Sequence, residues 1–167
     1  MYNGAVVAAV VPAYREERMI GRVIETMPAY VDHASGWHDQ GAGELLSPHV
    51  YVKRFRVPRA VRRGRERRVL ALSEYGGYAH AVPGRVWGAR AFGYRRFTSV
   101  AELAHAFRRL HEEQVVPAIA AGLSATVYTQ LSDVEDELNG LLTYDREAKL
   151  PEDVVQAVTA QLRLGPH

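Results

Sequence analysis

The most constraining feature of this sequence is the run VLALSEYGGY, which spans residues 69–78. It opens with four aliphatic residues and a serine, a pattern typical of a strand buried on both faces of a parallel sheet. Glu74 follows where this strand should stop, and Gly76 and Gly77 then allow a sharp turn or a close approach to a ligand. In barrels of alternating strands and helices, reacting groups lie at the carboxyl ends of the strands. The run predicts either a functional carboxylate or an ordinary surface glutamate.

Two other strands are expected near this run. Residues 44–52 form an apolar segment that carries His49 and Tyr51, and residues 124–131 form a last strand whose end, at Gln130, would face the same opening as the carboxylate. His49 is predicted to have a hydrogen-bonded structural role rather than to bind a metal. Together the three strands indicate a parallel sheet.

Helices are predicted after the glycines and at the end of the chain. A capping box opens a helix over about residues 99–122, which Pro117 should kink. Pro151 begins a final helix. His105 and His111 are both expected on the helix surface. Strands that alternate with helices predict the α/β class.

Composition limits the classes of function. The 167 residues, with 47% apolar and 24% charged residues, suit one globular core, although an eight-stranded barrel typically needs about 250 residues. The absence of cysteine excludes disulfides, thiol catalysis and thiolate metal sites. The longest apolar stretch, residues 5–11, is too short to cross a bilayer and lacks a basic leader. We therefore expect a cytoplasmic protein without a membrane partner.

Three blocks carry a resemblance to a known family. LSEYGGY, the upstream ASGWHDQGAGE and the downstream LSATVYTQLSDVEDELNGLLTYDR resemble the last part of the catalytic barrel of glycoside hydrolase family 2. This family contains β-galactosidase-like and β-glucuronidase-like retaining enzymes. The resemblance covers about residues 31–164. It implies a partial (β/α)8 TIM barrel, roughly the last four strand–helix units, preceded by one extra βα unit.

The same resemblance implies site residues. Glu74 resembles the catalytic nucleophile, and Tyr51 matches the tyrosine that orients the nucleophile by a hydrogen bond. Loop 78–94 carries several aromatic rings, including Phe92 and Tyr94, which could stack on sugar faces or simply pack the loop. The residues predicted to contact a β-glycoside substrate are Trp37, His49, Tyr78, Trp87 and Gln130.

The second catalytic carboxylate is not evident. Retaining glycosidases use two carboxylates about 5–5.5 Å apart. In the family the acid/base follows an asparagine, and the sequence contains no Asn-Glu pair. Asp39, Glu135 and Asp136 are only nominal candidates for this role. The chain is therefore expected to be a β-glycosidase fragment that acts on carbohydrates without metal or cofactor, and to be inactive or nearly so alone.

The amino-terminal segment resembles a different family. Residues 5–33 are similar to the start of glycosyltransferase family 2, whose first turn holds the nucleoside of a sugar nucleotide. A glycosyltransferase-like protein that binds a sugar nucleotide is therefore an alternative function. The nucleotide-contacting positions implied by that resemblance are Pro12, Ala13, Tyr14 and Glu16. The paired aspartates of that family do not follow. We therefore expect a βα unit at 1–33 and a partial barrel at 34–167, as a chimera or truncated relic, or with the first unit replacing a missing barrel element.

Two further expectations concern partners. Residues 53–68 contain eight arginines and a lysine, so a non-catalytic basic module that binds nucleic acid is an alternative function. A solvated connection without a nucleic-acid partner is favoured, because this segment has one aromatic residue, Phe55, and no nucleic-acid motif. A partial barrel would also leave open strand edges, which predicts self-association.

Overall fold

The computed structural model describes residues 35–39, 41 and 43–162, with the side chain of Ser35 excepted. The βα unit predicted for residues 1–33 lies outside these described residues. The same holds for the nucleotide-binding positions predicted within it, Pro12, Ala13, Tyr14 and Glu16.

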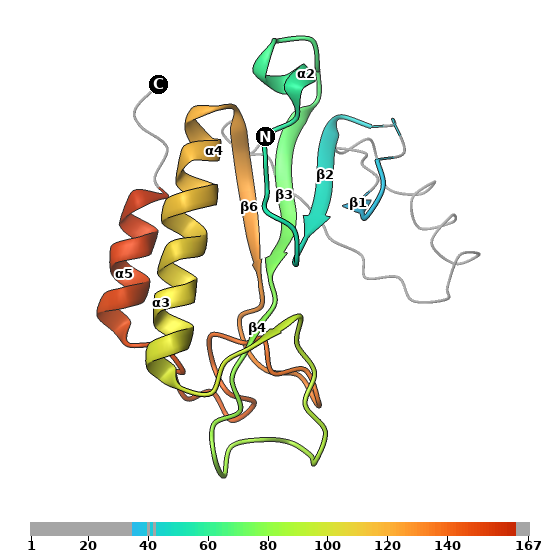
Figure 1. Cartoon of the computed structure of the whole chain (residues 1–167). Coiled ribbons are helices and arrows are strands. Elements are labelled where there is room, and N and C mark those ends of the chain that lie inside the picture. The colour runs from blue at the N-terminus through green and yellow to red at the C-terminus, as the bar shows by residue number, and fades with distance from the viewer. Residues whose placement is uncertain (1–34, 40, 42, 163–167) are drawn as a thin grey trace, which may run out of the picture.

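The larger sheet has four parallel strands in the order β1-β2-β3-β6 (Figure 1). Its strands are β1 (Ser35–Gly36), β2 (Leu45–Val50), β3 (Val69–Gly76) and β6 (Leu123–Thr129). A two-stranded parallel sheet pairs β4 (Tyr78–Ala79) with β5 (Arg95–Arg96). The predicted α/β class is confirmed. The strand expected to stop before Glu74 continues to Gly76, so this carboxylate lies within β3.

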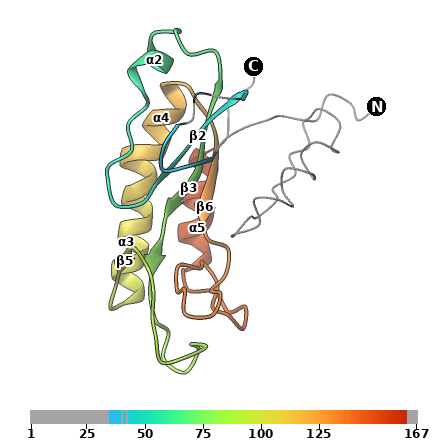
Figure 2. The ribbon, with the colours of Figure 1, turned by 90° about the vertical axis from the view of Figure 1, so that its right-hand side faces the viewer.

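The helices of the described chain are α2 (Arg59–Arg62), α3 (Val100–Leu110), the π-helical turn η1 (His111–Val115), α4 (Val116–Ala120) and α5 (Glu152–Gln161). The run from α3 to α4 is continuous and lies along one side of the larger sheet (Figure 2). Leu70 and Leu72 of β3 pack with Val115 and Ala118 of this run. Burial of these apolar side chains holds the helices on that side of the sheet.

The long helix follows the predicted signals at both ends. The Ser99 hydroxyl accepts a hydrogen bond from the Glu102 amide, as in a capping box. Pro117 lacks the N–H that would bond the Glu113 carbonyl, and Arg54 Nη2 donates to that carbonyl at 3.2 Å. The irregularity expected at the proline is the π-helical turn directly before it. Gly122, at φ +108°, ends the helix.

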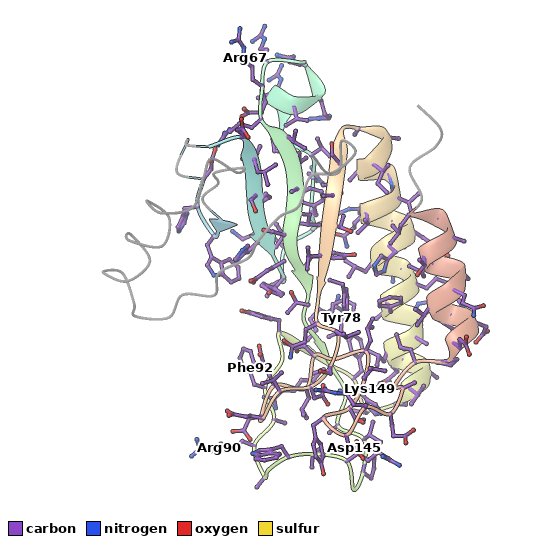
Figure 3. The ribbon with its side chains drawn as sticks, turned by 180° about the vertical axis from the view of Figure 1, so that it is seen from behind. Arg67, Tyr78, Arg90, Phe92, Asp145 and Lys149 are labelled. Carbon is purple, nitrogen blue, oxygen red and sulfur yellow. The ribbon has the colours of Figure 1, made fainter. Side chains whose placement is uncertain are left out.

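The basic segment connects β2 to β3. Phe55 and Val57 are buried in the core cluster with Leu70, whereas most arginines of the segment are exposed. Arg67 lies at the end of the molecule opposite Phe92 and Asp145 (Figure 3). This arrangement is that of a solvated connection anchored by two apolar side chains.

His111 does not lie on the helix surface, so that prediction is wrong. Its side chain is almost fully buried, with Nδ1 at 2.8 Å from the Phe107 carbonyl and Nε2 at 3.0 Å from the Tyr75 hydroxyl. Because a carbonyl only accepts, Nδ1 carries the proton and Nε2 accepts from Tyr75. Burial lowers the pKa of His111, since the charged ring would lose its hydration.

This burial predicts a pH-dependent loss of stability. Above the unfolded pKa of about 6.5, His111 is neutral in both states and contributes no pH dependence. As the pH falls below that value, only the unfolded chain binds the proton, so the free energy of unfolding falls by up to about 1.4 kcal/mol per pH unit. Urea unfolding of wild type and His111→Gln between pH 7.5 and 5 measures this difference. Parallel stability curves for the two proteins would contradict the prediction.

Candidate active site

Three strands bring polar side chains together at their carboxyl ends. The Tyr51 hydroxyl, just after β2, donates to Oε2 of Glu74 on β3 at 2.5 Å. The hydroxyl oxygens of Tyr51 and Thr129, the last residue of β6, lie 3.1 Å apart. Parallel pairing places these strand ends at one edge of the sheet, because all strands run the same way. The predicted bond between Tyr51 and Glu74 is therefore present, although the role assigned to it remains a prediction.

The Glu74 carboxylate is held on one side. His49 Nδ1 lies 3.1 Å from Oε2, the same oxygen that accepts from Tyr51. No described residue donates a hydrogen bond to Oε1, and the Glu74 side chain is 43% exposed. One oxygen of the carboxylate is thus contacted by two neighbours, and the other accepts no hydrogen bond from a described residue.

An aromatic cluster, here called the aromatic wall, adjoins this carboxylate and comprises Trp37, Tyr51, Phe92 and Tyr94. The Tyr51 and Tyr94 rings stack at 3.9 Å with an angle of 12° between their planes. Trp37 lies 5.6 Å from the Tyr51 ring and Phe92 lies 5.4 Å from the Tyr94 ring. Trp37 and Phe92 are 59% and 46% exposed, so the wall presents apolar ring surface to solvent beside Glu74.

Burial and nearby carboxylates raise the pKa values of both tyrosines in the wall. Burial and the hydrogen bond to Glu74 raise the pKa of Tyr51, so its hydroxyl stays protonated and can donate to the carboxylate. Burial, assisted by the negative charges of Glu74 and Glu137, raises the pKa of Tyr94. Glu137 is therefore a second carboxylate that the fold brings near the wall.

Gly77 makes room for the wall, and Gly76 makes room for Tyr128 of β6. Gly77 has φ +63°, and a Cβ there would lie 2.5 Å from Tyr94 Cδ2 and 2.8 Å from Tyr51 Cδ1. Gly76 has φ +94°, and its Cβ would lie 2.3 Å from Tyr128 Cε2. Real Cβ atoms do not approach carbon so closely, and both φ values strain other residues. The close approach that the Gly-Gly pair was predicted to permit is therefore present, to tyrosine rings.

Other predicted substrate contacts lie apart from the wall. Tyr78 is 4% exposed and packs beneath α3 with Phe97, so it presents no surface to a sugar. Trp87 is 67% exposed and packs against Tyr144 in the loops beyond the sheet. The Gln130 backbone pairs with residues 139 and 141, and its Nε2 is buried without a partner among the described residues.

Tyr94 and Phe92, rather than the predicted Tyr78 and Trp87, are the rings of the 78–94 loop that lie in the wall. Both belong to the 78–94 loop, where any of several rings could have approached the carboxylate. The deciding contact is the backbone bond from Tyr94 N to the Gly77 carbonyl, which returns the loop to the end of β3. Such long-range pairing leaves no periodic signal in the sequence.

Asp39 does not suit the role of acid/base. Both of its oxygens accept from Arg68, at 2.6 and 2.8 Å. These bonds, with one from the Gly41 amide, lower the pKa of Asp39 to about 2. A general acid needs a raised pKa to hold its proton near neutral pH. Glu135 and Asp136, on the loop after β6, form no hydrogen bond to Glu74.

Within residues 35–39, 41 and 43–162, no cluster of three or more histidine or acidic side chains is arranged to hold a metal ion. No helix in the same part of the chain is long and apolar enough to cross a bilayer.

Comparisons with protein-family models and with curated proteins find no match to this chain. The assignment of function therefore depends on the geometry around Glu74.

A pocket with a volume of about 540 Å³ lies elsewhere, between α3 and β5. Its lining includes Arg95, Arg109, Glu102 and Glu113 but not Glu74. Acidic and basic side chains alternate there, and Arg109 pairs with Glu113 at 2.8 Å. This mixed lining gives no chemistry comparable to the held carboxylate.

Proposed function

We propose that the chain provides the nucleophile half of a retaining β-glycosidase site, with Glu74 as the nucleophile. The observation that carries the proposal is the unequal environment of the two carboxylate oxygens: Oε2 accepts from Tyr51 and is contacted by His49, whereas no described residue donates to Oε1. A nucleophile needs this arrangement, because hydrogen bonds orient the group and favour its ionised form while one oxygen attacks the anomeric carbon. The parallel strands would then belong to a partial (β/α)8 barrel.

The aromatic wall supports a carbohydrate as the substrate. Sugars present flat faces of C–H groups, which bury apolar surface against exposed rings. Trp37, which contacts both rings of the stacked pair, and Phe92, which contacts Tyr94, offer such surface. No cofactor is needed, because glycoside hydrolysis uses only carboxylates and water.

The proposed activity is limited to substrates with good leaving groups. In the first half of the reaction, Glu74 Oε1 forms a bond to the anomeric carbon as the bond to the leaving oxygen breaks. A poor leaving group must receive a proton at this point, and Asp39 is held as an ion pair by Arg68. A dinitrophenolate leaves without protonation, so it isolates the function of Glu74.

The test is covalent trapping. We expect 2-deoxy-2-fluoro β-glycosides of dinitrophenol, in the gluco, galacto and manno series, to release one dinitrophenolate per chain. Intact-mass measurement and peptide mapping should place the trapped sugar on Glu74. Glu74→Gln should abolish both signals. Tyr51→Phe should slow trapping roughly tenfold to a hundredfold, as expected when a hydrogen bond of about 1.5–3 kcal/mol to a charged group is lost.

The control for Tyr51→Phe is Tyr144→Phe, which removes a hydroxyl from a ring that packs on Trp87, away from the carboxylate. That variant should be trapped at the wild-type rate. Absence of an adduct from every sugar in the panel, or an adduct that survives Glu74→Gln, would overturn the proposal.

A further inference from the structure

In the half of the larger sheet that contains β6, the described helices cover one face and leave the other uncovered. The Tyr128 ring of β6 lies 5.3 Å from Phe107 of α3, so it points toward the helices. Side chains alternate along a strand, which directs Ala125 and Val127 to the opposite face. Both are exposed, Val127 by 59%. Parallel sheets in proteins are normally covered on both faces, and no described element forms a layer on this face.

The sheet also has an unprotected edge. Among the described strands, β6 pairs with β3 alone and ends the order β1-β2-β3-β6. Its sequence, LSATVYT, contains no charged residue and no proline, the devices that usually keep an edge strand from pairing with another chain. β1 is the other edge of the described sheet. A further strand can therefore add to β6 through backbone hydrogen bonds without meeting a charge.

Four parallel strands are half of an eight-stranded barrel. We propose that a second copy of this chain closes the barrel, with β6 of each copy pairing in parallel with β1 of the other. A two-fold axis along the barrel relates the copies, so one pairing implies the other and no edge remains. The uncovered face, with Ala125 and Val127, becomes the interior. The helices, which lie on the opposite face, form the outside (Figure 1, Figure 2).

This assembly has a consequence for the candidate site. The symmetry places the carboxyl ends of all eight strands at one mouth, so the Glu74 of each copy opens into the same space. Two carboxylates at one mouth are what glycoside hydrolysis requires. This consequence depends on the proposed function, whereas the assembly itself does not.

The test is the mass of the protein in solution, which needs no substrate. Light scattering and sedimentation of the full chain should show a monomer–dimer equilibrium that saturates at twice the mass of one chain. Val127→Lys places a charge on the inner face of the edge strand, and we expect it to give a monomer at every concentration at which wild type is dimeric. Ala125→Lys should do the same.

The matched control is Trp87→Lys, which replaces another exposed apolar side chain by lysine in a loop beyond the sheet. That variant should remain dimeric. Circular dichroism verifies that each variant is folded. A wild-type chain that stays monomeric would overturn the proposal and indicate that its own residues 5–11, a predicted strand, cover the edge. A dimer unaffected by Val127→Lys, or growth beyond two copies, would overturn it as well.

Discussion

Replacing Lys149 with methionine is expected to lower the free energy of unfolding by about 3–5 kcal/mol. Lys149 and Asp133 form an ion pair at 2.6 Å with side-chain exposures of 0% and 1%. The ammonium group also donates to the Leu138 carbonyl at 3.0 Å, and Asp133 accepts from the Gly140 amide at 2.8 Å. Burial lowers the pKa of Lys149, and the bond to Asp133 opposes that shift. Without its partner, the Asp133 carboxylate would be a buried, uncompensated charge.

Urea unfolding measures the loss, and two variants define its cause. Lys53→Met removes an exposed lysine and should change stability by less than about 0.5 kcal/mol. The double variant Lys149→Met with Asp133→Leu should recover part of the loss, because no unpaired charge remains. Recovery should be incomplete, since the Gly140 amide loses its acceptor. A single variant as stable as wild type would show that water reaches the pair.

Gly77→Ala is expected to disrupt the aromatic wall and destabilise the fold by about 2–5 kcal/mol. The left-handed backbone at φ +63° contributes about 1–2 kcal/mol of this cost. Contacts of the new Cβ at 2.5 Å from Tyr94 and 2.8 Å from Tyr51 add about 1–3 kcal/mol, as in other overpacked sites. Since the two rings stack directly on each other, neither can move without displacing the Tyr51 hydroxyl from Glu74.

Gly84→Ala separates these two contributions. Gly84 has φ +77°, similar to that of Gly77, but a Cβ there meets nothing within 4 Å. Its loss in a urea titration should therefore reflect the backbone alone, and near-ultraviolet circular dichroism from the stacked tyrosines should stay unchanged. Equal losses for the two alanine variants would show that the wall tolerates the methyl group, contrary to the expectation.

Local signals predicted the elements well. The apolar run before Glu74 became β3, the capping box at Ser99 began α3, and Pro117 follows a π-helical turn. Each of these features depends on residues a few positions apart, so the sequence carries them directly. The prediction for His111 was wrong because its surroundings, Tyr75 and Phe107, depend on how the helix rotates against the sheet.

By itself, the sequence determined that this is an α/β protein with a carboxylate and two glycines at the end of a central strand. It also determined, through the resemblance that it carries, which tyrosine should meet that carboxylate. Only the tertiary structure decided that Tyr94 rather than Tyr78 adjoins the site. It also decided that two neighbours contact one oxygen of Glu74, and that Asp39 forms an ion pair with Arg68. The physical reason is distance along the chain. Strand alternation and helix caps are short-range properties, whereas rings and charges meet through loops whose closure the packing of the whole sheet selects.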